Sequence, residues 1–290
     1  MLEAVPNVSE GRNDAAVGAI GDAFASAARL LDVHSDPDHN RSVFTLAAER
    51  EALETSLLAG IARARELIDL RLHQGVHPRV GAADVVPLVP LAGGSMVEAE
   101  STALAVGEAV GRDLGLPVFL YGEVGRGRRP VFFRRGGLPE LRRRMASHEL
   151  VPEFGPLEPD TRSGVVLVGA RPPLVAYNVE LATDDPGVAR DVAAAIRESS
   201  GGLPGVQAIG LSLPRSRRIQ VSMNVLDLER SPLHEVVRRV EVEARARGVE
   251  AAGGELVGLV PQRVLDAAAS AGVRLPGVDE AHVLERRLGL

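Results

Sequence analysis

The sequence predicts an α+β fold of two subdomains, each an antiparallel sheet with helices packed on one face. Short segments with alternating apolar and polar side chains, typical of half-buried strands, are interspersed with longer segments that repeat apolar residues at the helical period. The segment "HELVPEFGPLEPDTRSG", residues 148–164, carries three prolines that break regular structure between the two halves. We interpret it as a hinge or binding loop, and we expect subdomains over residues 1–163 and 164–290.

The first half alternates strands and helices and includes one extra helix. Met96, Ala99, Ala103 and Val106 lie on one stripe of that helix. In chain order, the expected elements are a strand at 2–8, a helix near 13–28, strands at 29–35 and 42–48, helices near 50–69 and 95–113, and a strand at 116–122.

The second half has a clearer element order. In "RRIQVSMNVL", residues 217–226, Ile219 and Val221 alternate with polar side chains, which indicates a half-buried strand. A helix follows, with Ser231 as its expected N-cap and Pro232 at its first position. The expected elements are a strand at 174–181, a helix near 186–199, strands at 206–213 and 217–226, a helix at 231–248 and a strand at 249–261. This order is typical of a ferredoxin-like sandwich.

Composition excludes several classes of function. The chain has 290 residues, 45% hydrophobic and 25% charged, which is typical of a globular protein. Cysteine is absent, which excludes disulfides, thiolate nucleophiles and iron–sulfur clusters. Lysine is also absent, which excludes a P-loop lysine and a lysine Schiff base. The sequence shows no signal peptide and no apolar run of transmembrane length, so we expect a cytoplasmic protein without membrane contact.

Charge gives two opposite indications. The formal net charge of −6 argues against general attraction to nucleic acid or to an anionic membrane. The segment 126–144 differs, because it holds eight arginines and only one acidic residue, Glu140. This segment is either a solvated face or a local attractor for carboxylates or phosphates, which guanidinium groups bind in bidentate fashion.

The stretch "HQGVHPRVGAADV", residues 73–85, carries two histidines four positions apart. On a continuous helix such a pair can bind zinc, but Gly75 between them and Pro78 after them disfavour a helix. A second cluster, "HSDPDHNR" at 34–41, holds potential metal ligands that turn chemistry also explains. We therefore expect no metal, and a metal-dependent hydrolase is a minor alternative.

A loop that presents one imidazole is the other interpretation of this stretch. Pro78 favours an extended backbone at His77. Gly75 and Gly81 let the backbone approach a ligand closely. The imidazole of His77 can take and give a proton near neutral pH, while Arg79 can hold a substrate carboxylate. His77 is thus either a general acid and base or an ordinary histidine satisfied by its neighbours.

Blocks distributed over nearly the whole chain match a known family in the same order. The most specific are "VPNVSEGRN" at 5–13 and "HPRVGAADV" at 77–85. The others are "HNRSVFTL" (39–46), "LPVFLYGE" (116–123), "FGPL" (154–157), "VGARPPLVAYNVEL" (168–181), "QVSMNVLDL" (220–228) and "ELVGLVPQRVLDAA" (255–268). Together they resemble the formiminotransferase family, the glutamate formimidoyltransferases of histidine breakdown.

The resemblance implies two ferredoxin-like subdomains, a homodimer, and transfer of the formimino group from N-formimino-L-glutamate to N5 of tetrahydrofolate, the co-substrate. The products are 5-formiminotetrahydrofolate and L-glutamate. His77 takes the family's catalytic position, and residues 155–164 match its folate-binding loop, called the folate loop below. The residues that it implies for substrate binding are Gly155, Pro156, Arg162, Ser163, Gly164 and Asn178. Bifunctional members carry a following cyclodeaminase domain, so for a chain ending at Leu290 we expect a separate cyclodeaminase to act downstream.

The implied reaction gives roles to further residues. N5 attacks an amidine carbon, and one base takes the first proton and returns it to the leaving nitrogen, a role that suits His77. Asp84 is either a carboxylate that orients this imidazole or a turn residue at the start of a strand. Arg41, Arg79 and some arginines of 126–144 are expected to hold the carboxylates of the two substrates.

The sequence leaves room for a different substrate or for binding without catalysis. Related sequences often carry lysine where this chain has Gln74, and "GPLEPDTRSG" lacks the hydrophobic character usual in the folate loop. A family member with a different donor or acceptor is therefore one possibility. A non-catalytic folate-binding or RNA-binding protein is the second, since ferredoxin-like sheets also bind RNA. With two Tyr, six Phe and no Trp, the chain offers few aromatic side chains for stacking on bases.

Overall fold

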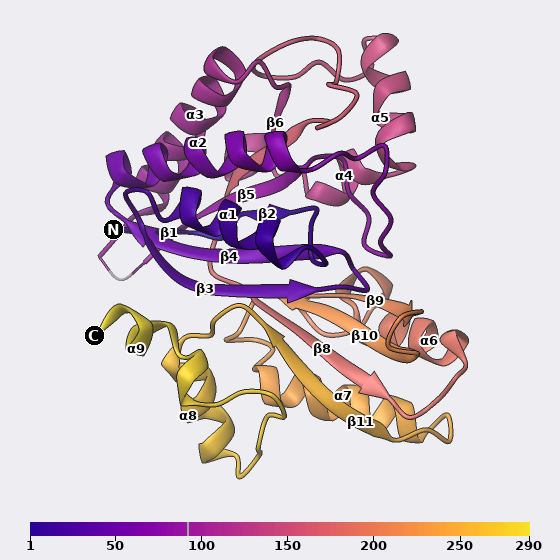
Figure 1. The fold of residues 1–290 in the computed structure, drawn as a ribbon. Coiled ribbons are helices and arrows are strands. Elements are labelled where there is room, and N and C mark those ends of the chain that lie inside the picture. The colour runs from indigo at the N-terminus through magenta and orange to yellow at the C-terminus, as the bar shows by residue number, and fades with distance from the viewer. Residues whose placement is uncertain (92) are drawn as a thin grey trace. The chain divides into compact units, whose positions relative to one another are not determined.

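The computed structural model describes residues 1–91 and 93–290, and their contacts divide the chain into two units, Met1–Pro172 and Pro173–Leu290 (Figure 1). Each unit has its own sheet and its own apolar core. The α+β class predicted from the sequence is therefore observed in both units. Within the described residues, every helix is too short or too polar to span a lipid bilayer.

The first unit, in its described residues, contains a sheet of seven strands. The strands are β1 (Leu2–Ala4), β2 (Asn7–Val8), β3 (Arg29–Asp36), β4 (Arg41–Ala48), β5 (Ala83–Pro90), β6 (Val118–Gly122) and β7 (Val166–Ala170). The helices are α1 (Asp14–Phe24), α2 (Arg50–Leu67), α3 (Met96–Asp113), α4 (Pro130–Arg134) and α5 (Gly137–Ala146). Across the sheet the order is β3, β4, then β1 and β2 end to end, then β5, β7 and β6.

Two prolines explain why β1 and β2 are separate strands. Both strands pair with β4 on one side and β5 on the other, and the break falls at Val5 and Pro6. Opposite the break lies Pro87 of β5, which has no N–H to donate; its carbonyl accepts the N–H of Val5 at 3.1 Å. The carbonyl of Pro6 accepts the N–H of Phe44 at 2.9 Å. The strand is thus interrupted without leaving the sheet.

The first sheet departs from our expectation in two respects. β7 pairs in parallel with β5 and with β6, so the sheet is mixed rather than antiparallel. Helices also cover both faces: α1, α2 and α3 share a core with Val86 and Leu120, whereas α4 and α5 share one with Val85 and Phe119. Strands buried on both faces are apolar without alternation. The sequence pattern did not predict β5 and β7 for this reason.

The proline-rich segment 148–164 lies inside the first unit and does not join the two units. β7 follows this segment and takes its place between β5 and β6. A division after residue 163 would therefore separate β7 from its sheet, whereas the contacts divide the chain between Pro172 and Pro173.

The second unit has the element order that the sequence predicts. Its strands are β8 (Val175–Leu181), β9 (Val206–Leu213), β10 (Arg218–Val225) and β11 (Ala251–Val257), and its helices are α6 (Pro186–Ile196), α7 (Leu233–Arg245), α8 (Gln262–Ser270) and α9 (Leu284–Leu288). The sheet is antiparallel, in the order β11, β8, β10, β9. The expected N-cap is wrong: α7 is preceded by Pro232, and Ser231 Oγ instead donates to Pro204 O at 2.7 Å.

Close packing of α1 against α2 depends on a residue without a side chain. Phe24 of α1 is fully buried and its ring centroid lies 5.1 Å from that of Phe44. A Cβ atom on Gly60 of α2 would stand 2.0 Å from Cδ1 of Phe24. Because the ring is enclosed on its other side by the core, it has little room to give way.

We predict that Gly60→Ala destabilises the first unit. Overpacking should lower the free energy of unfolding by about 1–3 kcal/mol. Gly18→Ala is the matched control, because Gly18 is exposed in α1 and a Cβ on it would have nothing within 4 Å. That change should raise the free energy of unfolding by about 0.5–1 kcal/mol through helix propensity. Urea denaturation measures both, and equal stability of the two variants would contradict the packing argument.

Candidate functional site

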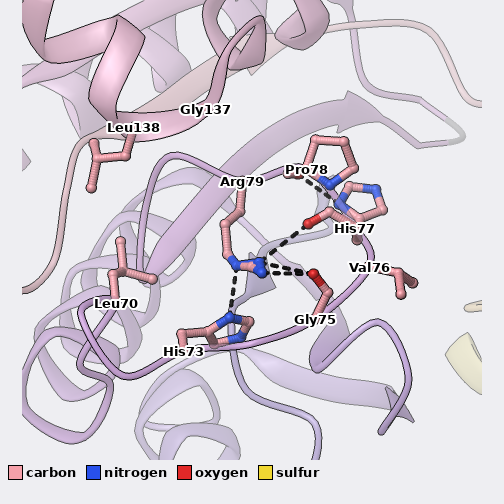
Figure 2. A pocket seen from close by; sticks show the side chains of 9 residues that line it. All are labelled: Leu70, His73, Gly75, Val76, His77, Pro78, Arg79, Gly137 and Leu138. Atoms are coloured by element: carbon pink, nitrogen blue, oxygen red, sulfur yellow. Dashed lines mark hydrogen bonds between the residues drawn. The ribbon is translucent and has the colours of Figure 1, made fainter. Parts of the chain in front are cut away.

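A cavity of about 320 Å³ opens at the histidine loop of the first unit, which we define as residues 73–79 (Figure 2). Most of its lining comes from this loop, and Leu70, Gly137 and Leu138 complete the wall. The stretch that the sequence distinguishes by its histidines therefore lines a cavity with apolar and polar sides.

Close backbone contacts fix the histidine loop. A Cβ on Gly75 would stand 2.2 Å from His39 O, so only glycine lets the loop approach the turn before β4 this closely. After the loop, Ser9 Oγ donates to Gly81 O at 2.7 Å. A Cβ on Gly81 would in turn stand 2.0 Å from Val165 O. The loop is thus held from both sides by the strands around it.

His73 holds the loop together through both ring nitrogens. Its Nδ1 accepts a hydrogen bond from Arg79 Nε at 2.7 Å (Figure 2). Its Nε2 donates to Asn40 O at 2.8 Å. Burial, and then the charge of Arg79, lower the pKa of His73, which suits the neutral form that these bonds require. Arg79 also donates Nη2 to Gly75 O at 2.9 Å. The guanidinium expected to bind substrate is therefore largely engaged within its own loop.

His77 has one ring nitrogen available. Its Nδ1 lies 2.7 Å from Pro78 O, and because a carbonyl oxygen only accepts, Nδ1 carries the proton. Nε2 is then the unprotonated nitrogen, and it has no hydrogen-bond partner within residues 1–91 and 93–290. This tautomer presents His77 as a proton acceptor.

Burial and neighbouring cations keep His77 neutral. Burial is the largest influence that lowers the pKa of His77 well below its usual 6.5, followed by the charges of Arg41 and Arg134. Asp84 opposes these effects, and His39, whose ring centroid lies 5.8 Å from that of His77, adds to them. At neutral pH the imidazole is therefore unprotonated and able to accept a proton.

The carboxylate oxygens of Asp84 accept hydrogen bonds from backbone and arginine donors, not from an imidazole. Its Oδ1 accepts the backbone N–H groups of Val80 at 2.8 Å and Gly81 at 3.2 Å. Its Oδ2 accepts Nη1 of Arg41 at 2.8 Å and Nη2 of Arg134 at 2.5 Å. All four acceptor positions are used, so this carboxylate does not orient the imidazole through the hydrogen bond that we expected.

Electrostatics reinforce this arrangement. Burial alone would raise the pKa of Asp84, but Arg134 and Arg41 outweigh it and hold that pKa well below its usual range. Burial lowers the pKa of Arg41 to about 10, so Arg41 still carries its charge at neutral pH. Arg41 Nε is fixed by Asn7 Oδ1 at 2.9 Å. The site therefore contains two buried cations and one buried anion.

The folate loop divides into two parts. Gly155 and Pro156 are exposed, beside the start of β6. Ser163 and Gly164 are buried, and a Cβ on Gly164 would stand 2.1 Å from Val80 O. The second part therefore lies against the backbone that follows the histidine loop.

Two other predicted binding residues have protein partners. Arg162 Nη2 donates to Glu66 O at 2.6 Å, and its Nε lies 4.0 Å from a carboxylate oxygen of Asp69. Asn178 lies in β8 of the second unit, where it is buried and donates Nδ2 to Glu255 Oε2 at 3.1 Å. These contacts give both side chains a structural role.

Sequence reasoning did not single out two residues of this site. Arg134 is one of eight arginines in 126–144, and no local pattern distinguishes it from the others. Asn7 falls inside the specific block at 5–13, so the sequence marked this segment as characteristic of the family. The block did not indicate that Asn7 contacts Arg41.

The "HSDPDHNR" cluster covers the end of β3, the turn at 37–40 and the first residue of β4. Asp36 Oδ1 accepts the backbone N–H groups of Asp38 at 2.7 Å and His39 at 2.8 Å, as turn chemistry predicts. Among the residues that the structure describes, no group of three or more His, Asp or Glu side chains is arranged to hold a metal ion.

Comparisons with known proteins cover nearly all of this chain. The formiminotransferase domain, N-terminal subdomain, matches residues 1–171, and the formiminotransferase domain matches residues 176–274. A glutamate formimidoyltransferase of Thermoplasma acidophilum is 38% identical over 99% of this chain and 97% of that protein. One of Streptococcus pyogenes serotype M1 is 36% identical over 91% of this chain and 90% of that protein.

A fused relative matches in the same way. The formimidoyltransferase-cyclodeaminase of Gallus gallus is 39% identical over 92% of this chain, which covers 52% of that protein. Two domain matches in the expected order, together with relatives aligned over most of their length, are sufficient to assign the family. The chain belongs to the formiminotransferase family.

Proposed function

We propose that this chain transfers the formimino group from N-formimino-L-glutamate to N5 of tetrahydrofolate. Family membership and the relatives named glutamate formimidoyltransferase support the reaction. The observation that carries the proposal is the state of His77: it is neutral, its Nε2 is an unused acceptor, and it lines a cavity.

The chemistry requires one group that moves a proton twice. N5 of tetrahydrofolate forms a bond to the amidine carbon of the donor, and His77 Nε2 takes the proton that N5 loses. His77 then returns this proton to the glutamate nitrogen as its bond to carbon breaks. L-glutamate leaves as an amine, and the formimino group stays on N5.

Positive charge near the cavity suits the substrates. The donor carries two carboxylates, and tetrahydrofolate carries a glutamyl tail, so both are anions at neutral pH. We propose that Arg41 and Arg79 attract the donor carboxylates and that the folate loop contacts tetrahydrofolate. Arg79 retains an Nη1 whose hydrogen bonds to Gly75 O and His77 O are long, at 3.4 and 3.3 Å. These weak bonds can be exchanged for a carboxylate.

We also propose a ferredoxin-like topology for both units. Across the second sheet, β9, β10, β8 and β11 follow the strand order of that topology. The first sheet repeats this order when β1 and β2 are counted as one strand, because its strands then run β3, β4, β1–β2, β5. β7 and β6 extend the sheet beyond β5. Following the family, we further propose a cytoplasmic homodimer.

A direct assay tests the proposed reaction. Purified protein mixed with tetrahydrofolate and N-formimino-L-glutamate should release L-glutamate and form 5-formiminotetrahydrofolate. N-formyl-L-glutamate, offered as a competing donor, should react more slowly because its carbonyl lacks the nitrogen of the amidine. Faster release of glutamate from the formyl donor would assign a different substrate, and no reaction with either would contradict a transferase.

His77→Asn should lower kcat by roughly 100-fold or more, the usual contribution of a general base. Asparagine keeps much of the size and hydrogen bonding of the side chain but cannot take the proton. KM for both substrates should change less than kcat, because the substrates still bind. Steady-state kinetics with a circular dichroism check of folding measure this, and a folded variant with nearly unchanged kcat would disprove the base.

His73→Asn is the matched comparison within the same loop. His73 bonds to Arg79 and Asn40 rather than facing a reactant, so we expect a rise in KM and a loss of kcat well below that of His77→Asn. Equal and severe losses of kcat in the two variants, restored by added zinc, would instead indicate a two-histidine metal site.

A further inference from the structure

Arg134, one of the arginines of segment 126–144, bonds to Asp84 in the site that contains His77. Its Nη2 bonds to Asp84 Oδ2 at 2.5 Å, and its side chain is only 13% exposed. Its Nε is enclosed and has no hydrogen-bond partner among the described residues. The neighbouring side chain in sequence, Arg135, is exposed. The two adjacent arginines therefore differ in environment although the sequence pattern treats them alike.

Aromatic packing fixes the position of Arg134. Phe133, the preceding residue of α4, is fully buried, and its ring centroid lies 5.2 Å from that of Phe119 in β6. This contact holds the short helix against the sheet. The guanidinium of Arg134 is then directed at the carboxylate of Asp84 in β5 rather than at solvent.

The resulting cluster has an unbalanced charge. Arg41 and Arg134 share a single carboxylate, Asp84, whose remaining acceptor positions are filled by backbone N–H groups. Two positive charges and one negative charge leave a net charge of about +1 in an environment that water screens poorly.

His77 lies three positions before Val80, whose backbone N–H donates to Asp84 Oδ1 at 2.8 Å. The ionisable groups that act on His77 are Arg41 of β4, Arg134 of α4, Asp84 of β5, and His39 of the turn before β4. Three of these four disfavour an imidazolium, and only Asp84 favours it. Burial is the largest influence that lowers the pKa of His77, and the cations act in the same direction.

We propose that Arg134 is a positioning residue that keeps His77 in its neutral, proton-accepting form through the shared carboxylate of Asp84. This inference rests on the proposed function, in which His77 is the base, but it concerns a property of the free protein. Arg134 need not touch either substrate, since its positive charge offsets that of Asp84, the one group that favours the imidazolium, and its hydrogen bond occupies Asp84 Oδ2.

Histidine titration by NMR tests this without any substrate. The Cε1 proton resonance of His77 is identified as the one missing from His77→Asn. In the wild-type protein we expect it to titrate well below 6.5, and in Arg134→Gln we expect the pKa of His77 to rise by roughly one unit, as removal of a nearby like charge does. Arg134→Lys keeps the charge and should stay near wild type, and Arg135→Gln is the control from the adjacent position.

The pH profile of kcat/KM gives the second measurement. The base is active only above its pKa, so raising that pKa should move the acid limb of the profile to higher pH by the same amount in Arg134→Gln. Arg135→Gln should leave the limb in place. A variant in which Arg134 only supported the fold would lose activity at every pH without moving the limb, and that result would overturn the proposal.

The two measurements separate the failure of this inference from the failure of the proposed function. A His77 resonance that titrates near 6.5 in the wild type, or does not move in Arg134→Gln, overturns the role of Arg134 whatever the activity. If Arg134→Gln does not fold, Arg134→Lys provides the test. A large rise in the pKa of His77 in that variant, which retains the positive charge, would also overturn the role of Arg134. A resonance that shifts while the acid limb stays fixed supports the effect of Arg134 and removes His77 as the base.

Discussion

The carboxylate of Asp84 is the interaction on which the site depends. It connects two backbone N–H groups after the histidine loop, an arginine of β4 and an arginine of α4 at distances from 2.5 to 3.2 Å. Removing this single buried anion would leave two buried guanidinium groups without compensation, which costs about 3–5 kcal/mol in comparable cases. The two backbone bonds fix the chain where it leaves the histidine loop, three positions after His77.

The mixed sheet makes this connection possible. Because β7 and β6 extend the first sheet beyond β5, a second apolar face is present, and α4 and α5 pack on it. A four-stranded antiparallel sheet with helices on one face would offer α4 no such support. The parallel extension, which the sequence pattern did not predict, thus brings an arginine from 126–144 to a carboxylate at the start of β5.

The sequence identified features that depend on local chemistry. Alternation predicted β8, β9 and β10, and the Gly and Pro residues around His77 predicted a loop rather than a zinc-binding helix. Features that depend on distant contacts were missed. β5 lacks alternation and contains Pro87, which has no N–H to donate to a neighbouring strand. The sheet tolerates this proline because it lies opposite the break between β1 and β2. The partners of Asp84 come from residues 43 and 50 positions away, and no spacing rule connects them.

The same limits apply to the proposed substrate-binding residues. Arg79, two positions after His77, has the chemistry of a carboxylate clamp, but His73 and Gly75 accept hydrogen bonds from its donors at 2.7 and 2.9 Å. The prolines of 148–164 correctly indicated an irregular segment, yet irregular backbone is equally compatible with a hinge between units and a loop within one. Only the pairing of β7 with β5 and β6 distinguishes the two.

In the proposed mechanism, the positive charge beside His77 has opposite consequences for the two proton transfers. It makes the imidazole a weaker base toward N5, because the imidazolium that forms lies near Arg41 and Arg134. It makes the same imidazolium a stronger acid toward the glutamate nitrogen, which must be protonated before it can leave. A single histidine that performs both steps works best when neither transfer is strongly uphill. Since amines leave poorly unless protonated, an environment that favours release of the proton assists the step in which the bond to glutamate breaks.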